Sequence, residues 1–175
     1  MKSKKLTLHI LRRLIFILLF FASYVLQFIC LPETRFPFPV FILIPLTVAV
    51  SMFEHEFQGL FYGLLAGALW DLASPVTDGM ITLLLTLAAC ITGLLSHYSL
   101  RCTLLSCLIF TSVISIIFSA VLLLFFVPLT EFEELRHTFL NFYLPGSIIT
   151  EILTVPVYFL VRKIFISTRT EKVSN

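Results

Sequence analysis

Long apolar runs separated by short polar breaks constrain this chain more than any other feature of its sequence. The chain is 59% hydrophobic and only 13% charged, whereas a soluble domain carries about 25% charged residues. A domain of 175 residues has too little interior to hide so many apolar side chains from water. Each run approaches or exceeds the length of about 20 residues that crosses a bilayer core as a helix. The sequence therefore predicts a polytopic integral membrane protein that forms a single all-α domain, residues 1–175. About six transmembrane helices are expected, at about 14–31, 36–53, 57–73, 80–96, 102–127 and 145–166.

The distribution of Lys and Arg predicts the orientation of these spans. If the spans alternate in direction, ten of the twelve Lys and Arg residues lie on one side, and the other side holds only Arg35 and Arg136. The positive-inside rule places the richer side, which carries both termini, in the cytoplasm. We therefore interpret the basic start as a topological anchor, in preference to a lipid or nucleic-acid site; its cations are Lys2, Lys4, Lys5, Arg12 and Arg13. A cleaved signal peptide also begins with basic residues, but the apolar run here is longer than a typical signal core.

Glycines recur every four residues in the third run. Gly59, Gly63 and Gly67 therefore share one face of the expected helix, and Asp71 follows one turn later. Small residues at this spacing let membrane helices approach closely. Two interpretations follow, which are packing inside the protein and docking of another protein's membrane helix. The fourth and fifth runs carry similar small-residue stripes, at Thr82, Thr86, Ala89, Gly93 and Ser96 and at Ser112, Ser115 and Ser119.

Asp71 and Glu151 are the acids that lie inside apolar runs. An ionisable group in the membrane is costly, so each must have a partner or a function. Asp71 lies near the end of its run and is interpreted as a cap for a neighbouring helix or for its own turn. Glu151 lies about six residues inside the last run, which predicts a position near the membrane surface and a hydrogen bond to a Ser or Thr of a neighbouring helix. The functional alternative for both acids is a proton or cation site.

Several further features carry predictions. Pro45 lies inside the second run and predicts a kink there. Residues 130–143 place acidic and apolar residues at helical spacing, which is typical of a short amphipathic helix on the membrane surface. The break at residues 54–56 is predicted to be a polar turn at that surface. No arrangement typical of nucleophilic catalysis is present, and the four cysteines lack the spacing of a metal site. We therefore predict a protein that is not an enzyme, with no cofactor and no metal.

The third run and the turn after it also carry a family resemblance. Gly63, Gly67, Asp71 and Gly79 fit a G-x3-G-(L/A)-x2-D pattern followed by a further glycine. On this pattern the chain resembles the rod shape-determining protein MreD family of bacterial inner-membrane proteins. That family has about six spans and is similar in form to the substrate-capture components of energy-coupling-factor transporters. The last run adds to the resemblance with Pro156, Phe159, Leu160 and Arg162.

The resemblance implies a structural role in the bacterial cytoplasmic membrane. A member of this family is expected to be a non-catalytic scaffold of the cell-elongation machinery, working beside lateral peptidoglycan synthesis. Its expected partners are an MreC-like protein, MreB, RodA and a transpeptidase, together with the lipid bilayer and without nucleic acid. The contact residues would come from the glycine-bearing faces. The alternative is a substrate-binding membrane subunit of a vitamin-type transporter, although the first run lacks the Ala-x3-Ala contact typical of such subunits.

Overall fold

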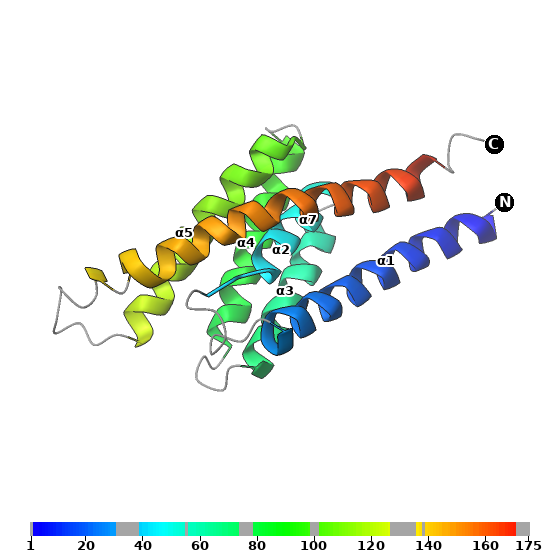
Figure 1. Ribbon diagram of the computed structural model, residues 1–175. Helices are drawn as coiled ribbons and strands as arrows, with labels where there is room; N and C mark the ends of the chain where they lie inside the picture. The colour runs from blue at the N-terminus through cyan, green and yellow to red at the C-terminus, as the bar shows by residue number, and fades with distance from the viewer. Residues whose placement is uncertain are drawn as a thin grey trace.

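The computed structural model describes residues 2–30, 39–54, 56–73, 79–98, 102–126, 136–137 and 139–170. These residues form helices and short connections and include no β-strand. In chain order the elements are α1 (Lys2–Val25), the π-helical turn η1 (Leu26–Cys30), α2 (Leu43–Phe53), α3 (Glu56–Ala73), α4 (Met80–Tyr98), α5 (Leu104–Phe126), the π-helical turn η2 (Phe139–Tyr143) and α7 (Leu144–Thr170) (Figure 1). The all-α prediction is confirmed for this part of the chain.

The short helix α2 lies at the centre of the structure. It contacts α1, α3, α4, α5 and α7, and every residue from Leu43 to Met52 is buried. A helix that is apolar all round is expected in such a position. An aromatic cluster of Phe41, Trp70 and Phe118 lies just before its start, with ring centroids 4.9 to 5.5 Å apart. The other helices surround α2, with α3 and α4 forming a close hairpin and α5 pairing with α7 (Figure 1).

Large apolar side chains cover the outside of the bundle, and small polar side chains lie inside it. On α4, for example, Leu83, Leu87 and Ile91 are each more than half exposed. Buried hydroxyl groups, in contrast, recur on several helices, at Thr47, Ser51, Thr92, Thr111, Ser115, Ser119, Thr150 and Thr154. Lipid solvates exposed leucine well, and small polar residues favour helix contacts within a membrane. This distribution indicates a protein surrounded by lipid.

Within the described ranges, four helical segments are long and apolar enough, by length and composition, to cross a membrane. They are Ile10–Phe28, Met80–Tyr98, Leu104–Leu124 and Phe139–Ser167. These segments match the predicted spans 14–31, 80–96, 102–127 and 145–166. The other two predicted spans, 36–53 and 57–73, correspond to α2, which has only 11 residues, and to α3, which is not among these four segments. The count of six spans stays a prediction.

Two local predictions from the sequence are wrong. Pro45 does not kink a long helix, because α2 begins only at Leu43 and a proline in the first turn of a helix leaves no hydrogen bond unmade. The last span does not begin at residue 145 as predicted: Pro145 and Gly146 lie in the first turn of α7, which follows η2 without a break, so the helical segment begins at Phe139. Half of the amphipathic surface helix predicted for 130–143 lies outside the described residues. Its last part, Phe139–Tyr143, is continuous with α7.

Candidate functional site

Two glycines of α3 lie directly against α4. A Cβ atom built on Gly63 would lie 2.6 Å from Cβ of Ala89 and 2.8 Å from the carbonyl oxygen of Leu85. A Cβ atom built on Gly67 would overlap Cα of Thr82. Such separations are possible only for glycine, because real Cβ atoms do not approach other heavy atoms so closely. Gly63 and Gly67 therefore let the backbones of α3 and α4 touch.

The other glycines of the predicted site have different surroundings. Gly59 faces α2, where a Cβ would lie 3.2 Å from the Cβ and Oγ of Ser51. Gly93 is buried in α4. Gly79 is exposed and has a φ of +85°, with open space around it. The face formed by Gly59, Gly63 and Gly67 is thus covered by α2 and α4 of the same chain. Of the two interpretations of this face, internal packing is the one that fits its geometry.

The carboxylate of Asp71 caps the start of α4. Its Oδ2 accepts hydrogen bonds from the backbone N–H of Thr82, at 3.0 Å, and from the Thr82 hydroxyl, at 2.5 Å. Thr82 is the third residue of α4, so its N–H has no partner within the helix. A negative charge is also favoured at this end by the helix dipole. Gly63, Gly67, Asp71 and Gly79 therefore belong to one structural unit, in which α3 is held to the start of α4.

Replacing Asp71 by alanine will lower stability. The change removes the cap and leaves the N–H of Thr82 without its acceptor, which costs about 1 to 2 kcal/mol. Asp71→Asn will lose less, because the amide oxygen can still accept. The matched control is Leu72→Ala, at the neighbouring exposed position. Denaturant unfolding in a mild detergent checks the prediction, and an Asp71→Ala protein as stable as the control would contradict it.

The non-helical segment before α2, residues 39–42, is held by hydrogen bonds to side chains of two other elements. The N–H of Leu43 donates to Oε1 of Gln27 in η1, at 3.1 Å. The N–H of Phe41 donates to Oγ1 of Thr150 in α7, at 3.2 Å. Buried backbone outside a helix needs such partners, above all within a membrane. The approach of α7 depends on Gly146, where a Cβ would overlap the carbonyl oxygen of Pro39.

Arg12 and Glu54 form an ion pair at the opposite end of α2. Arg12 Nε lies 2.8 Å from Oε1 of Glu54, and its Nη2 donates to Oε2 at 3.0 Å. The side chains are only 13% and 2% exposed. The guanidinium carbon of Arg12 also lies 5.2 Å from the ring centroid of Phe165 in α7, a cation–π contact. With its amide oriented to satisfy both neighbours, Gln58 donates to Glu54 and accepts from Arg13 at 3.2 Å.

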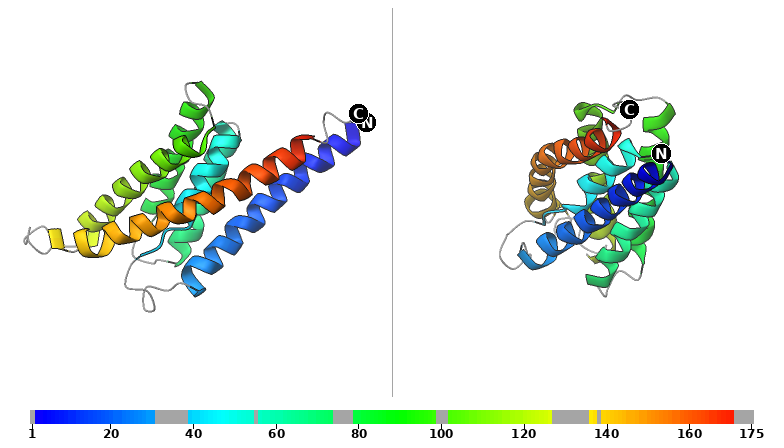
Figure 2. Two further views of the ribbon diagram at one scale, coloured as in Figure 1. Left: turned by 45° about the horizontal axis from the view of Figure 1, so that its top comes forward. Right: turned by 90° about the vertical axis from the view of Figure 1, so that its right-hand side faces the viewer.

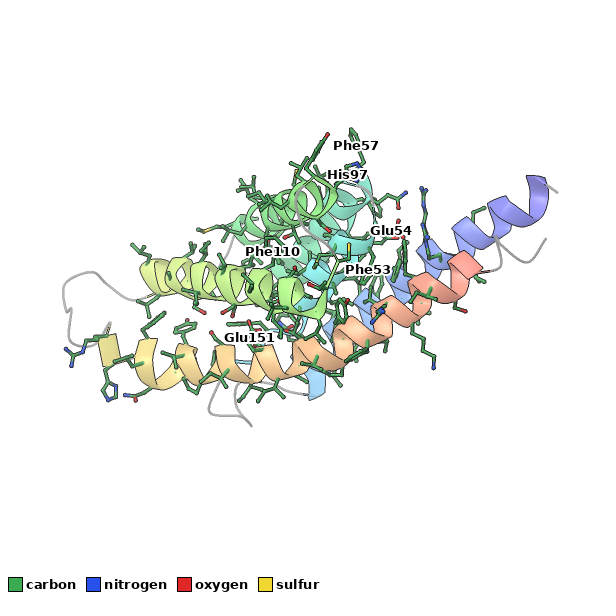
Figure 3. All side chains as sticks on the ribbon, turned by 90° about the horizontal axis from the view of Figure 1, so that it is seen from above. Phe53, Glu54, Phe57, His97, Phe110 and Glu151 are labelled. Atoms are coloured by element: carbon green, nitrogen blue, oxygen red, sulfur yellow. The ribbon has the colours of Figure 1, made fainter. Side chains whose placement is uncertain are left out.

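Glu151 lies between α5 and α7 (Figure 3). It is near the middle of the candidate span Phe139–Ser167, because the helix begins earlier than the sequence indicates; its predicted position near the membrane surface stays a prediction. Its Oε1 is buried and has no hydrogen-bond partner among the described residues. One turn earlier on α7, Ser147 accepts a hydrogen bond from Ser115 of α5, at 3.3 Å. The Ser or Thr partner expected for Glu151 is therefore not found for this oxygen.

Sequence reasoning missed the residues whose partners lie far away in the chain. Gln27 and Thr150 gave only a weak signal, as single polar residues within apolar runs, and Gly146 lies at the start of the predicted last span. Arg12 and Glu54 gave a stronger signal, because both residues flank predicted spans on the same side of the membrane. Comparison of the chain with protein-family models, with curated proteins and with solved structures finds no match.

Proposed function

We propose that this chain is a non-catalytic membrane scaffold of the bacterial cell-elongation machinery, as its resemblance to the MreD family implies. The observation that carries the proposal is that the residues on which the resemblance rests hold the same two helices together. Gly63 and Gly67 bring α3 against α4, and Asp71 caps α4. The one acid of the pattern thus stabilises a helix pair. A rigid helix pair is what a docking scaffold requires, since little ordering is then needed on binding.

The same contacts argue against a ligand-binding subunit. Interrupted membrane helices mark binding sites in many transporters, where free helix ends face the substrate. Here the interrupted segment before α2 is closed by Gln27 and Thr150, and the first residues of α2 are fully buried. This backbone needs no substrate to satisfy it.

The proposal includes six membrane crossings with both termini in the cytoplasm. The 11 residues of α2 span only about 16 Å as a helix, which is less than the hydrocarbon thickness of about 30 Å. This crossing therefore includes residues 39–42, which precede the helix. The 18 residues of α3 reach about 27 Å. The partners are those that the resemblance implies, an MreC-like protein, MreB, RodA and a transpeptidase.

Co-purification tests the scaffold role. The tagged chain is co-expressed with an MreC-like protein or, separately, with the ATPase and coupling subunits of an energy-coupling-factor transporter, and is extracted in mild detergent. We expect recovery of the MreC-like protein alone. Recovery of the transporter subunits instead, with a vitamin that raises the thermal midpoint by mass action, would replace the proposal with the transporter alternative.

A proton or cation path is a second candidate function, because one oxygen of Glu151 is buried without a partner in the described structure. Glu151→Met separates the two functions. In a scaffold this change keeps partner recovery and raises stability by about 1 to 3 kcal/mol, because it removes an unsatisfied buried oxygen. Proton or cation flux into vesicles that is present for the wild type and absent for Glu151→Met would establish the second candidate.

A further inference from the structure

The first part of α1 and the last part of α7 extend in the same direction beyond the rest of the bundle (Figures 1 and 2). The contact of Arg12 with the ring of Phe165 joins the two helices at the base of this projection. We call the segments Lys2–Arg13 and 162–170 the terminal basic pair, because they contain no acid and eight cations, Lys2, Lys4, Lys5, Arg12, Arg13, Arg162, Lys163 and Arg169.

Three of these cations have exposed side chains in the described structure. Arg12 is paired with Glu54, whereas the side chains of Arg13, Arg162 and Lys163 are exposed. Exposed apolar side chains lie beside them on both helices, at Ile10, Leu11, Leu14, Phe159, Leu160 and Ile166. Cations next to exposed apolar groups are suited to the boundary between lipid headgroups and acyl chains.

We propose that the terminal basic pair binds the phosphate headgroups of anionic phospholipids. Arg and Lys bind phosphate through charge-assisted hydrogen bonds, and anionic membrane surfaces attract clustered cations. A lipid is favoured over an acidic protein because the two segments adjoin or overlap the ends of the candidate spans Ile10–Phe28 and Phe139–Ser167. The cations are therefore at the level of a bilayer surface. The inference rests on the membrane assignment and is independent of the scaffold role.

Thermal unfolding of the full chain in mild detergent tests this site. Dioleoylphosphatidylglycerol added in mixed micelles is expected to raise the midpoint, and dioleoylphosphatidylcholine is not. The response should weaken with added salt, because exposed charges are screened. In the double variant Arg162→Gln/Lys163→Gln the affinity for phosphatidylglycerol should fall about thirtyfold, since each cation contributes roughly a factor of five.

The control is Arg136→Gln, which removes an exposed cation just before η2, at the other end of α7; it should respond to lipid as the wild type does. If the double variant is unstable without lipid, Lys4→Gln/Lys5→Gln replaces it and is expected to show a similar loss. The proposal is overturned if both lipids raise the midpoint equally, or if neither does. It is also overturned if a stable double variant binds phosphatidylglycerol as tightly as the wild type.

Discussion

Gly67→Ala will destabilise the protein more than any other single methyl addition among the glycines of α3. The added Cβ would overlap Cα of Thr82, and a backbone atom cannot rotate away as a side chain can. The helices α3 and α4 must therefore separate, which also moves Thr82 away from the carboxylate of Asp71. Overpacking of a close contact costs about 1 to 3 kcal/mol. We expect Gly67→Ala to reach about 3 kcal/mol and Gly67→Leu to prevent folding.

A series of glycine variants makes this prediction quantitative. Gly63→Ala should follow Gly67→Ala closely, because its Cβ meets the carbonyl oxygen of Leu85 as well as a side chain. Gly59→Ala should cost less, since the Ser51 atoms it meets are 3.2 Å away. Gly79→Ala adds strain at a φ of +85° but no clash, so its cost is about 1 kcal/mol.

The measurement is denaturant unfolding of each purified variant in one mild detergent. Leu64→Ala, at an exposed position of α3, is the matched control on the same helix. Equal stability of Gly67→Ala and Gly79→Ala would contradict the close contact of α3 with α4. It would also return the glycine face to the alternative of docking another protein's helix.

Local spacing made part of the structure predictable from the sequence. The apolar runs locate the four candidate spans because length and hydropathy are properties of one segment. The four-residue spacing of Gly59, Gly63 and Gly67 predicts a close helix contact, and the position of Asp71 after them favours a cap. All of these features follow from neighbours along a single helix.

Contacts between distant segments were not predictable in this way. The non-helical segment before α2 depends on Gln27, 16 residues away from Leu43, and on Thr150, 109 residues away from Phe41. Without these acceptors, continuing the helix back through the apolar residues 36–42 would be the expected solution. The start of the last helical segment was not predictable for a related reason, because Pro145 and Gly146 alone suggest a helix start. In the structure the helix continues from η2 through Pro145 and Gly146, and Gly146 packs against Pro39.

Breaking the ion pair of Arg12 with Glu54 is the second change with a large expected effect. Removing one partner of a buried pair leaves the other charge without compensation, which costs about 3 to 5 kcal/mol. Glu54→Ala leaves the guanidinium of Arg12, 13% exposed, with the ring of Phe165. Arg12→Ala leaves the carboxylate of Glu54, 2% exposed, with the amide of Gln58. Both variants should therefore unfold at much lower denaturant concentrations than the wild type.

A double-mutant cycle separates the pair from its surroundings. Because each single change strands a buried charge, Arg12→Met/Glu54→Met should be more stable than either single Met variant, with a coupling energy of about 2 kcal/mol or more. Arg13→Met is the control, since Arg13 is exposed and its loss should change stability by no more than about 0.5 kcal/mol. Strictly additive single changes would show that the two groups do not stabilise each other. In that case the ion pair would not hold the projecting ends of α1 and α7 to α2. Apolar contacts would have to hold them, such as the contact between Phe53 and Phe165, whose ring centroids are 5.4 Å apart.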